Sequence, residues 1–168
     1  MKAVLISIAI IIMIIPVVVY GIAIFNAIQM DANCISYFSM AADANSVDLA
    51  EKHLTTGIEY LEKHNLTSGH TNFIIYNPTN DIGFWYDNLK SAQTQLQQLK
   101  AKEDLTELEE SNALMKLRET LLDEGSVTHP SIISFYPNHI GWIIAMALIW
   151  ILWVLGFGLG WFAFEECY

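Results

Sequence analysis

Val4 to Phe25 read VLISIAIIIMIIPVVVYGIAIF, a stretch that contains no charged residue. A helix rises 1.5 Å per residue, so a stretch of this length covers about 30 Å, the thickness of a bilayer's hydrocarbon core. Pro16 is compatible with a membrane span, where neighbouring groups satisfy the freed backbone carbonyl. The apolar run is longer than the ~7–15 residues of a cleaved signal peptide core. The sequence therefore predicts that residues 1–25 form an uncleaved transmembrane signal anchor.

A second apolar stretch, residues 141–164, lies near the other end of the chain. Two such spans divide the chain into a first span, a central domain at 26–125, a membrane-proximal linker at 126–140, a second span and a short tail at 165–168. The predicted fold class is an all-α membrane protein in which two transmembrane helices flank an extracytoplasmic helical bundle.

The orientation of this protein rests on Lys2, the one basic side chain close to either span. The positive-inside tendency then places both termini in the cytoplasm and the central domain outside it. We therefore expect the protein in a plasma membrane or a bacterial inner membrane, with its tail at 165–168 cytoplasmic.

Charge and cysteine usage exclude several classes of protein. Of the 18 acidic and 8 basic residues, only Lys2, Glu165 and Glu166 lie outside residues 26–140. The acidic excess of the central domain argues against nucleic acid as a partner. Cys34 and Cys167 would lie on opposite sides of the membrane, so no internal disulfide is predicted, and Cys34 is expected to be a free thiol.

The central domain carries four segments with helical apolar periodicity, separated by one clear loop at 66–81 and two weaker breaks at 43–46 and 101–104. If both breaks are real, the segments form a folded four-helix bundle; if neither is, they form one long antiparallel hairpin. The folded bundle is favoured because it buries the apolar stripes more completely. The stripes are Ile28, Ile35 and Phe38; Val47, Ala50, Leu54, Ile58 and Leu61; Ile82, Trp85, Leu89, Ala92, Leu96 and Leu99; and Leu105, Leu108, Leu114, Leu117 and Leu121.

The second span contains the small-xxx-small pair Gly156 and Gly160. Such pairs let two helix backbones approach closely in lipid. In an antiparallel pair of spans they would face a second pair, Ala3 and Ser7, and together these four residues are the predicted helix-packing site. Trp142 and Trp161 stand at the two ends of the second span, where they are predicted to be membrane-interface anchors.

Two aromatic clusters flank the turn at 77–81. Exposed apolar clusters on a polar domain often mark contact surfaces, and this set is the predicted partner-binding site. Its members are Phe73, Ile75, Tyr76, Phe84, Trp85 and Tyr86.

No motif in the sequence indicates an enzyme. The five histidines lack HExxH or HxxxH spacing, and there is no glycine-rich phosphate loop and no GxSxG. Paired carboxylates such as Glu109 and Glu110 fall on helix surfaces, where nothing pairs them with a cleft. We predict no catalytic residue, no metal and no cofactor.

Two functions from different classes fit these features. The first is a non-enzymatic interaction or assembly subunit that contacts the lipid bilayer and other membrane-protein subunits, or copies of itself. The second follows from a resemblance: the order of span, outer helical bundle and span is similar to the ligand-binding half of bacterial chemoreceptors and sensor kinases. That resemblance implies a sensor-like module, although only residues 165–168 follow the second span. An oligomeric channel is a third, weaker reading because both spans lack ionisable residues.

Overall fold

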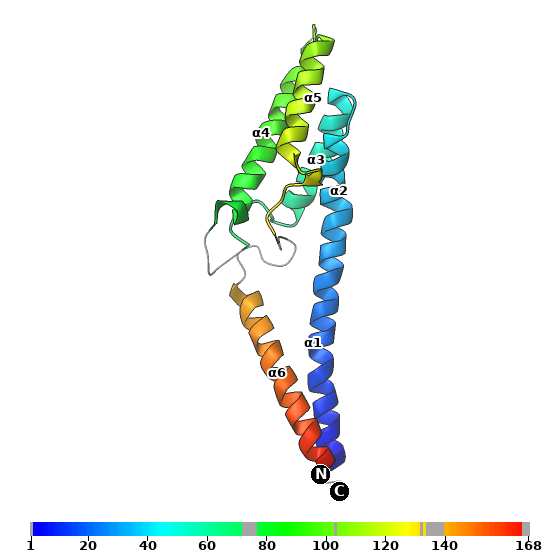
Figure 1. Cartoon of the computed structure of the whole chain (residues 1–168), viewed down its shortest axis with the longest axis vertical. Helices are drawn as coiled ribbons and strands as arrows, with labels where there is room; N and C mark the ends of the chain where they lie inside the picture. Colours follow the sequence, from blue (N-terminus) through cyan, green and yellow to red (C-terminus); the bar gives the residue numbers. More distant parts are fainter. Residues whose placement is uncertain (1, 72–76, 103, 132, 134–139, 166–168) are drawn as a thin grey trace. The chain divides into compact units, whose positions relative to one another are not determined.

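The computed structural model describes residues 2–71, 77–102, 104–131, 133 and 140–165. The described chain is mostly helical (Figure 1), which confirms the predicted helical class. It divides into two units: Met1–Asn26 with His139–Tyr168, and Ala27–Asn138. We call them the apolar helix pair and the helical domain.

The apolar helix pair consists of the first part of α1 (Lys2–Met30) and α6 (Ile140–Glu165). Large apolar side chains of both helices are exposed, among them Val17 at 63% and Val154 at 70%. Among the described residues, one helical stretch, Ile10–Ala42, is long and apolar enough to cross a bilayer, and Ala147–Gly158 is a shorter apolar helix. The predicted N-terminal span is therefore matched by a helix of suitable length and composition.

A few positions of the apolar helix pair are buried, and they repeat at a spacing of seven. Pro16 and Ala23 are buried on α1, and Ile149 and Gly156 are buried on α6. Residues seven apart lie on one helix face, so each helix has one packed side. Tyr20 lines an apolar pocket together with Ile149 and Trp153.

The helical domain begins where α1 continues without interruption into a π-helical turn, η1 (Asp31–Ile35), and then into α2 (Ser36–Ala42). Its other helices are α3 (Val47–Lys63), the short 3₁₀ turn η2 (Pro78–Asn80), α4 (Ile82–Lys100) and α5 (Glu107–Leu121). A hairpin of β1 (Leu122–Asp123) and β2 (Ser126–Val127) follows, with Leu122 opposite Val127.

Local side chains set the helix starts. The side chain of Ser46 accepts the N–H of Leu49 at the start of α3, and that of Asp81 accepts the N–H of Phe84 at the start of α4. Thr106 and Glu109 form a complete capping box at the start of α5. Both weak breaks are therefore real, the folded arrangement of four segments is present, and the long-hairpin alternative is not.

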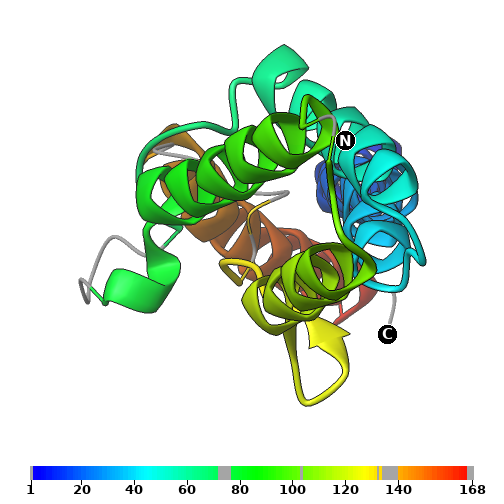
Figure 2. The same ribbon diagram turned by 90° about the horizontal axis from the view of Figure 1, so that it is seen from above.

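The helices pack in a cycle around one core. In Figure 2, which looks along the domain, α3 lies between α2 and α4, and α5 lies against α2. The α4–α5 side of the cycle is packed less closely than the α2–α3 and α3–α4 sides. The core residues are Met30, Cys34, Phe38, Ala41, Ala42, Val47, Ala50, Leu54, Ile58, Leu61, Leu66, Ile82, Trp85, Leu89, Leu96, Leu117, Leu121 and Ile133.

Phe38 occupies the centre of this core. It is fully buried, its ring meets the Trp85 ring edge-on at 5.7 Å, and it covers the backbone of Gly57 in α3. An ideal Cβ at Gly57 would lie 2.4 Å from the Phe38 Cε1 atom. Gly57 therefore permits a close approach of α2 and α3 that no larger residue would allow.

Two predicted stripe residues are not in the core. Ile28 is 58% exposed and Leu108 is 70% exposed. The π turn after Met30 shifts the phase of the helix, so that Met30 and Cys34 face the core in place of Ile28. Leu108 lies in the first turn of α5, beside the capping residue Thr106.

Candidate interaction groove

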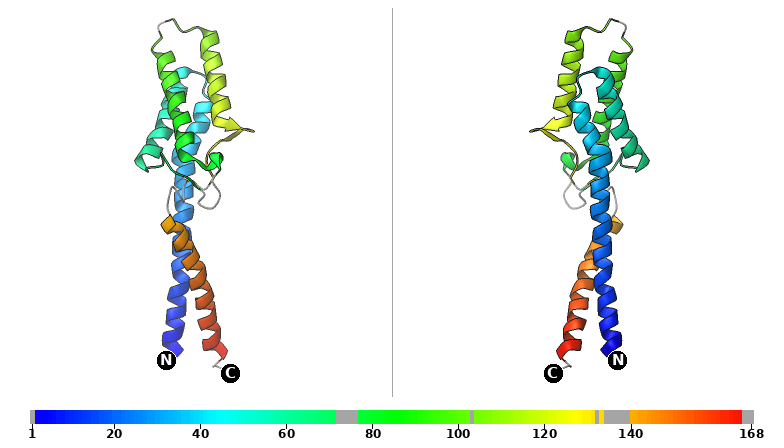
Figure 3. Two further views of the ribbon diagram at one scale, coloured as in Figure 1. Left: turned by 90° about the vertical axis from the view of Figure 1, so that its left-hand side faces the viewer. Right: turned by 90° about the vertical axis from the view of Figure 1, so that its right-hand side faces the viewer.

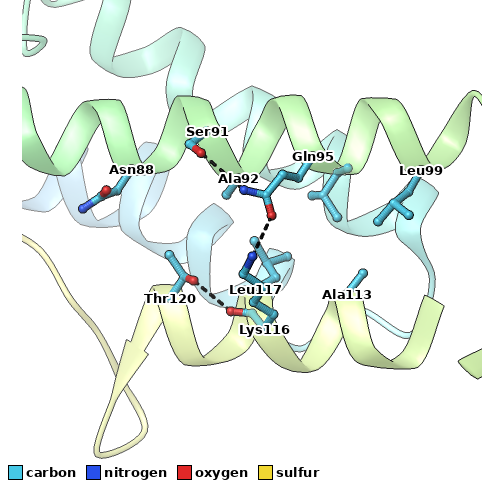
Figure 4. A pocket seen from close by; sticks show the side chains of 10 residues that line it. Asn88, Ser91, Ala92, Gln95, Leu99, Ala113, Lys116, Leu117 and Thr120 are labelled. Atoms are coloured by element: carbon cyan, nitrogen blue, oxygen red, sulfur yellow. Dashed lines mark hydrogen bonds between the residues drawn. The ribbon is translucent and has the colours of Figure 1, made fainter. Parts of the chain in front are cut away.

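A groove runs between α4 and α5, which lie side by side and antiparallel (Figure 3). Its volume is about 170 Å³, and Figure 4 shows the side chains that line it. We call it the α4–α5 groove. Its lining residues are Asn88, Ser91, Ala92, Gln95, Leu96 and Leu99 of α4, and Ala113, Lys116, Leu117 and Thr120 of α5.

The floor and rim of the α4–α5 groove differ in chemistry. Leu96 and Leu117 are buried at its base, and Ala92, Leu99 and Ala113 are half-buried beside them. The rim is polar and exposed, and consists of Asn88, Ser91, Gln95, Lys116 and Thr120. This division follows from spacings of three and four along both helices, which turn one edge of each apolar face toward the groove.

A chain of hydrogen bonds crosses the α4–α5 groove. The Lys116 ammonium donates to the Gln95 side-chain oxygen at 3.1 Å, and the Gln95 amide donates to the Ser91 hydroxyl at 3.3 Å. Lys90, Lys100, Lys102 and Arg118 all make ion pairs with carboxylates. Within the described part of the chain Lys116 makes none, like Lys52 and Lys63 of α3, and it is the one of these three that lies at the rim of the groove.

A groove with an apolar floor, a polar rim and an axis along two helices suits an amphipathic helix, whose apolar side chains enter at spacings of three and four. Small residues at Ala92 and Ala113 leave room for such side chains. The sequence did not predict this site because its apolar residues, such as Leu96, Leu99 and Leu117, were assigned to two core stripes.

The predicted partner-binding residues have different positions. Phe73, Ile75 and Tyr76 lie outside the described residues. Phe84 is 62% exposed, as expected of a contact residue. Trp85 belongs to the core instead: it is 9% exposed, and its indole N–H donates to the Thr128 carbonyl at 2.8 Å. On α4, Trp85 lies on the buried face of the helix, whereas its neighbour Phe84 lies on the exposed face.

Tyr86 is half-buried and bridges α4 to α3. Its hydroxyl donates to the Glu62 carboxylate at 2.6 Å. Partial burial and this carboxylate raise the pKa of Tyr86 to about 12. The bonds from Tyr86 and Lys90 lower the pKa of Glu62. Tyr86 therefore has a structural contact that the sequence did not indicate.

Phe84 opens onto an apolar pocket of about 290 Å³ at the start of α4. Pro78, Leu89 and Pro130 also line it, together with the edge of Trp85. The bond from Trp85 to Thr128 holds the segment after β2 against α4 and so closes one side of this pocket.

The predicted helix-packing residues lie in the apolar helix pair. Gly156 is buried and Ser7 is exposed. The side-chain surroundings of Ala3, Gly160 and Trp142 fall outside the description, whereas Trp161 is 70% exposed. Close packing through Gly156 with Gly160, Ala3 and Ser7 stays a prediction, as do the two tryptophan anchors.

Cys34 is a free cysteine, as expected, but it is fully buried. Its thiol lies 3.5 Å from the Gly57 carbonyl, to which it donates. We predict that a membrane-impermeant maleimide leaves Cys34 unmodified in the folded protein and modifies it once denaturant unfolds the domain. Mass spectrometry of the residues around Cys34 measures this, and rapid labelling without denaturant would contradict its burial.

Among the described residues, no three His, Cys, Asp or Glu side chains are close enough to hold a metal ion. Two of the histidines pack against tyrosines: His53 lies 6.0 Å from the Tyr37 ring, and His64 stacks on Tyr60 at 4.2 Å. These ring contacts give His53 and His64 a packing role.

The capping box of α5 makes the stability of the domain depend on pH. Hydrogen bonds from Lys102 and Thr106 lower the pKa of Glu109 from 4.5 to about 2. A lowered folded-state pKa stabilises the domain above pH 4.5, and this stabilisation is lost as the pH falls toward 2. We expect Glu109→Gln to show a smaller fall in melting temperature between pH 5 and pH 2 than the unmodified protein.

Circular dichroism melts across that range measure the effect, with Glu107→Gln as the control. Glu107 lies in the same first turn but outside the capping box. If the melting temperatures of Glu109→Gln and the unmodified protein fall equally between pH 5 and pH 2, the capping box does not cause the loss of stability in acid.

No protein family model matches the chain, and no curated protein or solved structure is significantly similar to it.

Proposed function

We propose that this chain is a non-enzymatic, two-pass membrane protein that acts as an assembly subunit: its two apolar helices lie in the bilayer, and its helical domain binds a helix of another subunit in the α4–α5 groove. The observation that carries the proposal is that groove, with its apolar floor, its polar rim and the Lys116 ammonium, which bonds to Gln95 and makes no ion pair with a described residue.

The apolar helix pair supports the membrane part of this proposal. Exposed side chains such as Ile11, Val17, Val154 and Phe157 would meet lipid rather than water. α6 spans 26 residues, enough to cross a hydrocarbon core when its whole length is counted. The helical domain between the two spans would then lie on one side of the membrane, and by the positive-inside tendency that side is extracytoplasmic.

Partner binding is tested by filling the α4–α5 groove from its rim. Ser91→Trp places a large side chain over the floor without replacing a buried residue. Gln98→Trp is the matched control, since Gln98 is exposed on α4 and does not line the groove. The full chain is extracted gently from its own membrane and its complexes are weighed by native mass spectrometry.

We expect the unmodified chain and Gln98→Trp to carry the same defined subunit, and Ser91→Trp to lose it while keeping its helical circular dichroism. Retention of the subunit by Ser91→Trp would refute the groove as the binding site. A monomer that carries a small molecule in place of a subunit would favour the sensor-like function.

Membrane topology is tested separately with a new accessible thiol, because Cys34 is buried. Lys52→Cys puts a thiol on the exposed side of α3. An impermeant maleimide applied outside intact cells should label this thiol. Labelling only after the cells are opened would invert the proposed orientation.

A further inference from the structure

The π-helical turn η1 lies within a continuous helix, between α1 and α2. Such turns contain one residue more than an α-helical turn, are rare, and frequently lie at functional sites. The Asp31 carbonyl accepts the Ser36 backbone N–H, five residues later, which is the bond that defines the turn, and it also accepts the Ser36 hydroxyl at 2.8 Å.

The burial pattern shows what the extra residue does. Met30, Cys34 and Phe38 are all buried, at two successive spacings of four. In a regular α-helix, at about 100° per residue, eight residues turn about 80° beyond two full turns. The inserted residue removes about one residue's rotation, so Met30 falls within about 20° of Phe38 on the core-facing side.

Contacts in and after the turn hold η1 and α2 against α3, whereas the last turn of α1 adds one buried residue to the core, Met30. Phe38 covers Gly57 and Cys34 donates to the Gly57 carbonyl, so both are held against α3. Ahead of the turn within the helical domain, Met30 is buried whereas Ile28 and Gln29 are largely outside the core. Return of the turn to α geometry would therefore keep α2 in place and rotate α1.

We propose that η1 is a rotational switch within the helical domain, between the last turn of α1 and α2. In the π state Met30 faces the core. In the α state the Ser36 hydroxyl releases the Asp31 carbonyl, and α1 turns by about 100° about its own axis, which takes Met30 away from Phe38. A binding event that favours one packing of the domain would therefore rotate the last turn of α1.

The switch does not depend on the α4–α5 groove, and it is tested within the helical domain of the full chain in nanodiscs. Spin labels at Ile28→Cys and Lys52→Cys, in a Cys167→Ser background, report the distance from α1 to α3. A side chain at the surface of a helix moves roughly 8 Å in a 100° rotation, given a helix diameter of ~10–12 Å. Met40→Cys with Lys52→Cys is the control pair, since both positions are exposed and follow the turn.

We expect two distance populations for the 28–52 pair, separated by up to roughly 8 Å, and one population for the 40–52 pair. Ser36→Ala removes the side-chain bond that accompanies the backbone bond of the π turn and should enlarge the α-state population. Deletion of the exposed Ala32 shortens the step from Met30 to Phe38 from eight residues to seven. In a regular α-helix this shorter step places Met30 on the core-facing side, as the π turn does in the unmodified chain. The deletion should therefore collapse the 28–52 distances to a single population.

A single 28–52 population that is the same in the unmodified chain and in Ser36→Ala would overturn the switch. If the Ala32 deletion does not fold, the comparison of Ser36→Ala with the unmodified chain still tests whether the switch exists. Two populations in the 40–52 control pair would also overturn it, because the motion would then belong to the whole domain rather than to the turn.

Discussion

Gly57→Ala should lower the unfolding free energy of the helical domain by about 3 kcal/mol. The new Cβ would lie 2.4, 2.8 and 2.9 Å from three atoms of the Phe38 ring. That ring is fully buried and also meets the Trp85 ring edge-on, so any shift of Phe38 would disturb the packed core. For a domain of this size, we expect the melting temperature to fall by about 10–20 °C.

This expectation has the opposite sign to that of helix propensity alone. Alanine in place of glycine inside a helix should stabilise by about 1 kcal/mol. Gly21→Ala adds the same methyl group outside the helical domain, at a position where a Cβ meets nothing within 4 Å, and should leave the melting temperature of the domain unchanged. Thermal melts followed by circular dichroism measure both variants. An unchanged or raised melting temperature for Gly57→Ala would show that α2 and α3 are not in close contact at Gly57.

Trp85→Ala should destabilise the domain by about 3–5 kcal/mol, the usual cost of removing a large buried aromatic side chain. Three contacts are lost together: the edge-on contact with Phe38, the packing against the rest of the core and the hydrogen bond to the Thr128 carbonyl. Trp85→Phe keeps most of the apolar contact and loses the bond, at a cost of about 1 kcal/mol. Chemical denaturation of the three proteins separates these contributions.

Phe84→Ala is the control for this series because Phe84 is exposed, and its effect on stability should stay within about 0.5 kcal/mol. A partner that contacts the exposed aromatic side chain would be lost from Phe84→Ala without any change in melting temperature. Equal destabilisation by Phe84→Ala and Trp85→Ala would mean that Phe84 is also part of the core.

Most helix boundaries of the domain could be predicted because they are encoded locally. The sequence pattern allows Asp81 as the cap of α4, and this cap forms. Ahead of α5 it allows two capping boxes, Asp104 with Glu107 and Thr106 with Glu109, and the second is the one that forms. The polar turn at 43–46 likewise ends one helix and starts the next. A cap depends on residues only three apart, so the sequence is enough to locate it.

Features that depend on packing could not be predicted in the same way. The π turn is visible only once Met30 and Cys34 are known to face the core together with Phe38. The sequence placed Trp85 both in the apolar stripe of α4 and in the partner-binding set, and the structure shows that the stripe is right, whereas Phe84 is exposed. The α4–α5 groove depends on how far two helices stand apart, and neither helix encodes that distance alone.

The hairpin of β1 and β2 was missed because each strand has only two residues, too few for a periodic pattern. The two residues of its turn, Glu124 and Gly125, both have positive φ, 48° and 83°. A tight two-residue hairpin turn of this kind requires positive φ at both positions. Both are exposed, and nothing lies within 4 Å of a Cβ built on Gly125.

That turn gives the domain an attachment point. An epitope or a fluorescent peptide inserted between Glu124 and Gly125 would leave the chain at an exposed loop tip, the kind of position where insertions are best tolerated. The four helices and the α4–α5 groove would keep their own sequences. The protein could then be imaged or captured in cells through a label that leaves the sequences of α1 and α6 unchanged.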